Sequence, residues 1–291
     1  MTLEGASVTA LWVALALTAG AAVAYWGHLL SEMALAPRTG NGAFLGGWRP
    51  PLGAMGTLCA WLALGAMVTS LVCRWLASHR PPWANMWEFT AAFTGAIMAF
   101  HVLFERAYGQ RMRMVGAVVQ PLVLALLVVN MAFFPWQVEP LVPALQSRGV
   151  LAAHVGIMVL AYGAFTVSFG AAVLQLLQGE GRRFSWLPQA AALDVVAFRA
   201  VAVGFPLLTL GIAIGAYWGN MAWGRYWGWD PKETSSLMTW LIYGVYLHLR
   251  AVRGWRGITG AWVLVVAYLS VLFTYFGVNL AISSLHSYAG V

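Results

Sequence analysis

Long, almost continuously apolar stretches alternate with short polar segments along the chain. Each stretch can cross the hydrocarbon core of a bilayer, which takes about 20 helical residues. None shows the period-two alternation of a transmembrane β-strand, and lipid requires a spanning segment to satisfy its own backbone hydrogen bonds. The pattern predicts an all-α integral membrane protein with about eight transmembrane helices, at 7–30, 52–73, 86–104, 114–135, 151–176, 200–219, 234–249 and 260–282.

Two prolines and the first apolar run need separate interpretation. Pro121 and Pro206 fall inside the fourth and sixth runs. We expect both helices to kink and continue, because neighbouring helices can accommodate the freed carbonyl groups. The first run is longer than the apolar region of a signal peptide and lacks a basic segment before it, since Glu4 is the only preceding charge. We therefore expect a retained helix there.

The composition supports a membrane protein. Hydrophobic residues make up 61% of the sequence and charged residues 9%, and the mean hydropathy is +0.76. These values lie far outside the range of soluble domains. We interpret residues 1–291 as a single polytopic membrane domain. The sequence has no Walker loop or dinucleotide-binding glycine motif, so we expect the function to lie in the membrane and its short loops.

The basic residues predict the orientation. An even number of spans places both termini on one side, and eleven of the 16 basic residues lie in the loops and helix ends of the opposite side. The positive-inside rule therefore predicts both termini on the outer side. We interpret the net charge of +7 as an orientation signal and expect no nucleic-acid partner.

The two cysteines, Cys59 and Cys73, both lie in the second span. The chain contains no Cys-x-x-Cys string, which argues against a thiol-redox enzyme and against covalent haem on this chain. We interpret both residues as small packing side chains.

The segment 217–233, YWGNMAWGRYWGWDPKE, concentrates tryptophans on the predicted outer side. The four indoles are Trp218, Trp223, Trp227 and Trp229. Such residues gather at membrane interfaces without any ligand, so an aromatic belt is one interpretation. The alternative is a platform for a large planar apolar ligand, on which indole faces stack while glycines let the backbone approach. Composition alone leaves both open.

Asp230 ends this loop in a pattern typical of a helix start. Pro231 follows at the first helical position, and Glu233 stands three residues after Asp230. This spacing predicts a capping box that fixes the loop to the seventh helix.

Two histidines share the predicted level of the tryptophan loop. His154 lies at the outer start of the fifth span and His286 just past the outer end of the eighth. A histidine near an interface is commonly a satisfied polar residue, but two at one depth beside an aromatic platform suit bis-imidazole ligation of haem iron. His248 falls near the inner boundary, about 21 Å along the seventh span. His28 and His101 also map toward inner helix ends, and we assign His79 no role.

The sequence resembles a known family in several stretches. WGNMAWGRYWGWDPKET, continued by WLIYGVYLHLR, resembles the WWD signature of haem-handling proteins, most closely the CcsA (ResC) branch of the System II cytochrome c synthases. NMWEF at 85–89, AHVGIMVLAYGAF at 153–165 and LHSYAG at 285–290 agree with that branch. One departure is Ser235 and Ser236 after KET, where many relatives first carry a tryptophan.

This resemblance implies a function and specific residues. The loop from Trp218 to Asp230 would bind b-type haem non-covalently, as a substrate, on the outer face, with His154 and His286 as axial ligands. His248 would hold haem in transit near the inner side, opposite a ligand from a separate CcsB (ResB)-like membrane protein. The chain would act in that complex as a holocytochrome c synthase and would attach haem to apocytochrome c. We expect the bacterial cytoplasmic membrane, with the thylakoid membrane as the alternative.

Three other functions remain open from the sequence. A CcmC-like chaperone would share the loop and histidines but hand its haem to a carrier. A b-type electron-transfer protein would need histidine pairs on facing helices, which only the inner histidines could supply. A transporter would show repeat symmetry and broken helices. We name no catalytic acid or base, although Asp230 and Glu88 lie on the predicted outer side.

Overall fold

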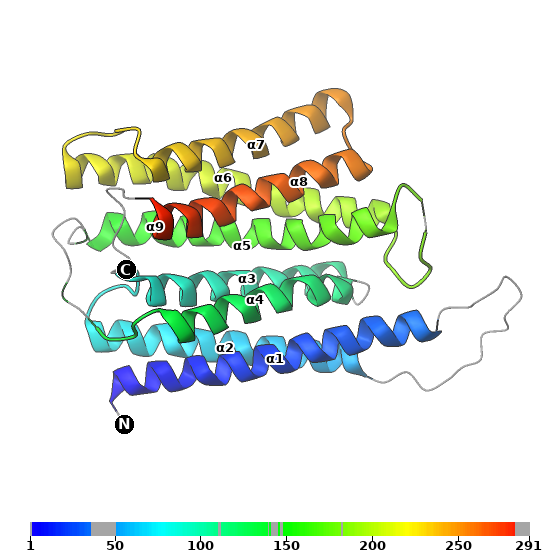
Figure 1. Cartoon of the computed structure of the whole chain (residues 1–291), viewed down its shortest axis with the longest axis horizontal. Coiled ribbons are helices and arrows are strands. Elements are labelled where there is room, and N and C mark those ends of the chain that lie inside the picture. The colour runs from blue at the N-terminus through cyan, green and yellow to red at the C-terminus, as the bar shows by residue number, and fades with distance from the viewer. Residues whose placement is uncertain are drawn as a thin grey trace, which may run out of the picture.

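The computed structural model describes residues 2–35, 51–109, 112–138, 140, 145, 148–181 and 183–282. These residues form helices and connecting segments, with no strand among them (Figure 1). The elements are α1 (Leu3–Leu35), α2 (Leu52–Ser78), α3 (Met86–Tyr108), α4 (Arg113–Phe133), α5 (Arg148–Gln178), α6 (Ala190–Trp223), α7 (Pro231–Arg253), α8 (Gly257–Leu272), the π-helical turn η3 (Phe273–Gly277) and α9 (Val278–Ala281).

The predicted helices are confirmed, with small differences at their ends. Each predicted run lies on one helix, apart from two residues after α4 and the eighth run, which η3 interrupts. Pro121 and Pro206 lie inside α4 and α6, as expected. Within the described residues, seven helices are long and apolar enough to cross a membrane. α7 is not among these seven, because its first turns read PKETSS and its last turns carry His248, Arg250 and Arg253.

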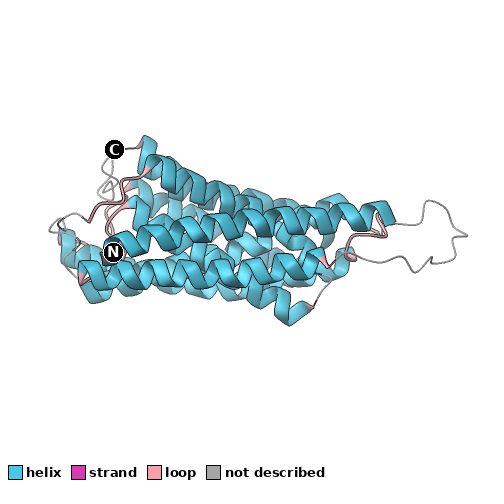
Figure 2. Cartoon of the chain, turned by 90° about the horizontal axis from the view of Figure 1, so that it is seen from below, coloured by secondary structure: helices cyan, strands magenta, loops and turns pink. Residues whose placement is uncertain are grey.

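The helices run side by side along one long axis (Figures 1 and 2). α1 to α4 form one half of the bundle and α5 to α9 the other, and α5 joins the halves by packing on α3 and α4. A close approach between α3 and α5 depends on Gly163, where an added Cβ would lie 2.9 Å from the carbonyl carbon of Ala96. The described residues therefore pack as one body around α5.

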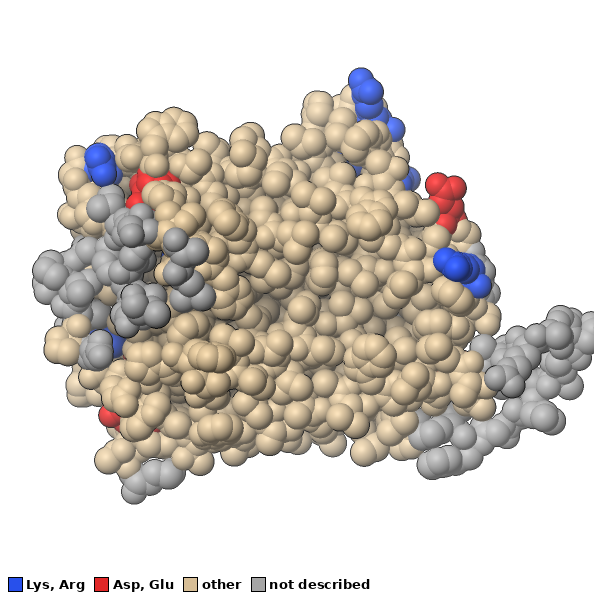
Figure 3. All heavy atoms as spheres, viewed as in Figure 1, with Lys and Arg blue, Asp and Glu red and all other residues tan. Residues whose placement is uncertain are grey.

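Alternate connections meet at each end of the bundle. The connection Gly224–Asp230 between α6 and α7 lies at the same end as the start of α1 and the end of α9 (Figure 1). We call this the loop end and the opposite one the far end. On the face seen in Figure 3, charged side chains gather at the two ends and leave an uncharged band between them. This is the distribution expected of a bundle that crosses a bilayer.

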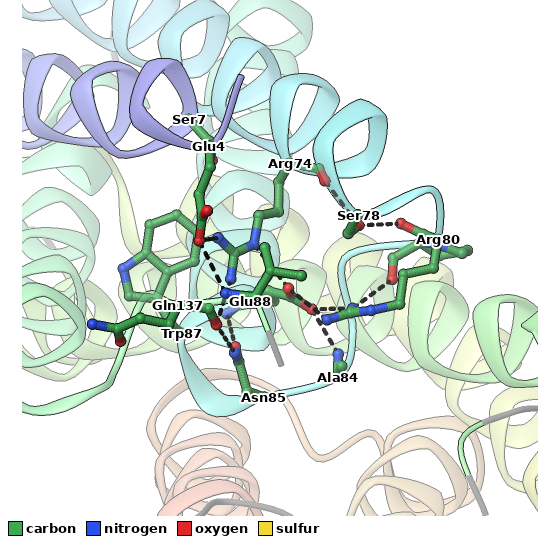
Figure 4. Close-up of polar contacts among 12 residues, drawn as sticks. Glu4, Ser7, Arg74, Ser78, Arg80, Ala84, Asn85, Trp87, Glu88 and Gln137 are labelled. Carbon is green, nitrogen blue, oxygen red and sulfur yellow. Dashed lines mark hydrogen bonds and ion pairs between the residues drawn. The ribbon is translucent and has the colours of Figure 1, made fainter. Parts of the chain in front are cut away.

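A buried ion-pair network ties the helices together at the loop end (Figure 4). Glu88 on α3 and Arg74 on α2 both have 0% exposure. The Glu88 carboxylate accepts from Arg74 Nε at 2.8 Å, from Arg80 at 2.7 Å and from the backbone N–H of Ala84 at 2.8 Å. Arg74 also pairs with Glu4 of α1 at 3.4 Å. Glu88 thus has a structural role, because both arginines and the Ala84 amide engage its carboxylate.

Replacing Glu88 with alanine should destabilise the protein by about 3 kcal/mol, because two buried arginines would lose their counter-charge. The measurement is thermal unfolding of the purified protein in detergent. Glu180→Ala, at an exposed position beyond α5, serves as the control and should unfold like the unsubstituted protein. Equal unfolding temperatures for the two variants would contradict this role for Glu88.

Candidate functional site

A cavity opens at the loop end between α5, α6 and α7. Its volume is about 1000 Å³, counting the space at its open mouth. Most of its wall is apolar or aromatic, and α3 and η3 complete it through Phe89 and Tyr275. Such a lining suits a large, flat and mostly apolar ligand.

His154 on α5 lines this cavity with a fixed imidazole ring. Its Nδ1 lies 2.8 Å from the carbonyl oxygen of Gly211 on α6. A carbonyl oxygen only accepts, so in the neutral ring Nδ1 donates and Nε2 carries the lone pair. This is the arrangement by which a second contact orients a metal-binding histidine.

Gly215 provides the space for this ring on α6. A Cβ at that position would lie 2.5 Å from His154 Cε1 and 2.7 Å from Nδ1. The Trp218 ring lies parallel to the imidazole, with 9° between the planes and 6.2 Å between the centroids. The last turns of α6 therefore hold His154 from two sides.

The four tryptophans come from two different elements, which differs from the expected single loop. Trp218 and Trp223 lie on the final turns of α6, and only Gly224–Asp230 connects α6 to α7. Trp218 is 2% exposed and packs edge-on against Trp223 at 4.7 Å. Trp218, Trp223 and Trp227 line the cavity, whereas Trp229 is 69% exposed and does not. Two of the three tryptophans that line the cavity thus lie on a helix.

The connection between the helices is held by backbone hydrogen bonds. The predicted capping box at Asp230 is confirmed. The Glu233 carboxylate accepts from the backbone N–H of Gly228 at 2.8 Å and of Asp230 at 3.1 Å. Gly224 ends α6 with φ +74, and Trp229 adopts φ 56, a conformation rare for a large side chain. The strained backbone at Trp229 indicates that the capped loop fixes the exposed position of this side chain.

Lys232 brings a positive charge into the cavity wall. Its Nζ donates to Asn279 Oδ1 on α9 at 2.7 Å and lies 5.9 Å from the centre of the Phe89 ring. Asn279 is oriented in turn, because its Nδ2 donates to the carbonyl of Tyr275 at 2.6 Å. Asn279 on α9 therefore holds the ammonium of Lys232, which lies at the start of α7.

His248 lies near the far end of α7, about 25 Å along the helix axis from Pro231. It is exposed, and Leu241, Val245 and Val252 on the same face of α7 are exposed too. α7 packs on α6 and α8 with its other side. His248 therefore points away from the described part of this bundle.

His28 and His101 lie in a different part of the bundle from His248. His101 is buried on α3 and packs edge-on against Tyr25, and His28 on α1 lies against Gly53 of α2. Both belong to the half of the bundle opposite α7 (Figure 1). Neither can therefore serve as the ligand opposite His248 within one chain.

The remaining predicted residues are placed as follows. His286 lies outside the described residues. Cys59 and Cys73 are free thiols on α2, which contributes no residue to the cavity. The packing interpretation therefore stands.

The sequence did not point to several cavity residues. Trp83 precedes α3, and its buried indole N–H has no hydrogen-bond partner among the described residues. Lys232 follows Pro231, where the sequence pattern indicates only a helix start. Asn279, a polar residue late in the last apolar run, was a signal that could have been used, because such residues are uncommon within spans.

Comparison with known proteins covers the part of the chain that forms this cavity. A family model described as cytochrome C assembly protein matches residues 83–286, which include the whole cavity wall. The chain is 34% identical to the cytochrome c biogenesis protein CcsA of Synechococcus elongatus, over 82% of this chain and 87% of the relative. The CcsA of Gloeobacter violaceus is 32% identical over 82% of this chain and 87% of the relative.

The chain belongs to the CcsA family. The CcsA of Chlamydomonas reinhardtii is similar as well, with 35% identity over 76% of this chain and 65% of the relative. This CcsA-family chain is a multi-pass membrane protein of cytochrome c biogenesis, a process in which haem is handled and joined to apocytochrome c. The family resemblance predicted from the tryptophan-rich string is thus confirmed.

Proposed function

We propose that the cavity at the loop end holds haem for attachment to apocytochrome c. The observation that carries this proposal is His154, whose imidazole is fixed by Gly211 and Trp218 at the wall of an aromatic cavity. Haem is the substrate here, bound without a covalent bond. It requires an axial nitrogen with a lone pair and flat apolar walls, and both are present.

The aromatic residues favour a ligand platform over a membrane belt. A belt presents its indoles to the lipid interface at scattered helix ends. Here Trp218, Trp223 and Trp227 face a common cavity from α6 and the capped loop. In this proposal they stack against the porphyrin and exclude water from it. Trp229 and Asp230 belong to the same loop, in which Trp229 presents an exposed edge and Asp230 fixes the backbone.

His286 is the proposed second axial ligand. It follows Ile282, the last described residue, by four residues, a reach of at most about 14 Å. Asn279, just before that point, touches Lys232 in the cavity wall. The chain therefore has the length to return a histidine to the cavity.

The proposed reaction is thioether formation on the bound haem. A cysteine thiol of the apocytochrome adds across each haem vinyl group, so that sulfur bonds to one carbon and hydrogen to the other, with no net oxidation. The protein contributes mainly orientation, because a fixed porphyrin and a docked peptide need little further ordering. A histidine of the apocytochrome would then replace one axial histidine and carry the haem away.

The first prediction concerns the axial ligand. His154→Gly should lose most haem from the purified protein, and added imidazole should restore much of it, because imidazole replaces the lost ligand in kind. The measurement is haem per protein with the absorption spectrum, with and without imidazole. Unchanged haem content without imidazole would rule out His154 as a ligand.

The second prediction concerns ring orientation. Gly215→Ala should displace the His154 ring and break its contact with Gly211, which weakens haem affinity by about tenfold. Gly65→Ala on α2 is the matched control, since no atom lies within 4 Å of its added Cβ. Affinities would be compared by haem titration, and an unchanged affinity in Gly215→Ala would contradict the orienting role.

We further propose that His248 holds haem in transit, with a ligand from a CcsB (ResB)-like partner. A histidine on an outward face of a membrane helix is costly in lipid, so its exposure favours a face covered by another protein. The separation of His248 from His28 and His101 leaves the opposite ligand to that partner. With the loop end outside, haem would enter at His248 and travel outward to His154.

The third prediction tests this inner site in the co-purified complex. His248→Ala should lower total haem and cytochrome c yield, and imidazole should restore the haem. Val245→Ala, one turn earlier on the same face, is the control for packing and should change neither. Unaltered haem and yield in His248→Ala would remove the inner site.

A CcmC-like haem chaperone remains the second candidate, because the same cavity would serve it. The two differ in product. Covalent haem on an apocytochrome peptide, measured with the purified complex, supports the synthase, whereas release of unmodified haem alone supports the chaperone.

A further inference from the structure

Lys232 is the only lysine among the 16 basic residues of the chain, and it lies in the wall of the cavity. The other basic residues are arginines. An ammonium group differs from a guanidinium by its compact charge and three donors. A single ammonium in a largely apolar wall needs acceptors for its N–H groups.

This ammonium donates no hydrogen bond to a carboxylate among the described residues, and the nearby Asp230 carboxylate attracts it only through space. Its one hydrogen bond among the described residues goes to the neutral amide of Asn279, at 2.7 Å. The two acidic neighbours are engaged by the backbone. Asp230 accepts from the N–H of Lys232 at 3.1 Å, and Glu233 accepts from Gly228 and Asp230.

The geometry also holds the ammonium in place. Asn279 cannot easily rotate, because its amide group donates to Tyr275 in the π-helical turn at 2.6 Å. The Phe89 ring lies on another side of the ammonium, at 5.9 Å. Donation to Asn279 leaves two N–H groups of the ammonium for an acceptor. Trp83 adds a buried indole N–H without a partner among the described residues.

We propose that Lys232 binds a carboxylate of the ligand in this cavity, namely a haem propionate. A cation held in apolar surroundings gains most from an anion that enters the same space. Haem carries two carboxylates on one edge and its vinyl groups on the rings of the other edge. Binding at Lys232 therefore turns the carboxylate edge toward α7 and α9 and the reactive vinyl edge away from them.

This inference rests on the proposed haem site and assigns Lys232 a positioning role. The test titrates purified protein with haem and with haem dimethyl ester, which keeps the iron, the ring and the vinyl groups and lacks only the free carboxylates. Lys232→Met should weaken haem binding about tenfold or more, the range of a charge-assisted hydrogen bond, and leave ester binding unchanged. Lys232→Arg should retain most of the haem affinity.

Arg225→Met is the matched control, since it removes an exposed cation of the same loop that does not line the cavity. Both of its affinities should equal those of the unsubstituted protein. Selective acetylation of Lys232, the only lysine, repeats the loss of charge in protein that has already folded and should weaken haem binding to the same extent. Equal binding of haem and ester by the unsubstituted protein, with no effect of Lys232→Met or acetylation, would overturn this inference and leave the haem site standing. Failure to bind either porphyrin would overturn both.

Discussion

Lipid offers no hydrogen-bond partners, and this constraint shapes the whole molecule. It requires helices for every crossing, and it requires each buried charge to bring its own counter-charge. Glu88 is accordingly held by Arg74 and Arg80 at the loop end, and Asp194 by Arg250 at 2.5 Å at the far end. These pairs join consecutive helices, α2 to α3 at the loop end and α6 to α7 at the far end. They fix the two ends of the bundle, and the cavity lies at the loop end.

The same constraint distinguishes two kinds of polar group in the cavity, those that the protein itself satisfies and those that keep donors for a ligand. Gly211 occupies one nitrogen of His154, and the loop amides occupy Glu233, so these polar atoms are satisfied before any ligand enters. Lys232 and the indole of Trp83 are different, because their donors exceed the acceptors around them in the described structure. Such an imbalance is costly when the site is dry, and it is relieved by a ligand that brings acceptors. We therefore regard these two residues as adapted to a ligand.

The division of the bundle gives the two proposed haem positions different surroundings. His154 lies between helices of one chain, whereas His248 lies on an outward face of α7. In the proposed function, residues of this chain would hold haem at the loop end, whereas haem at His248 would take a ligand from a second protein. Transfer between the two proposed positions would cover most of the length of α7.

The sequence by itself determined the helices, because a run of about 20 apolar residues has one stable form in lipid. It also determined the family, through the tryptophan-rich string, and the capped start of α7, because a capping box is a local pattern. Only the tertiary structure decided which histidines share a space. His28, His101 and His248 have similar predicted depths. Helix packing nevertheless places His28 and His101 in one half of the bundle and His248 in the other. It also decided that Trp218 belongs to α6 and that Lys232 meets Asn279, 47 residues later. Such contacts depend on how the helices pack around α5, and the local periodicity of the sequence does not predict that packing.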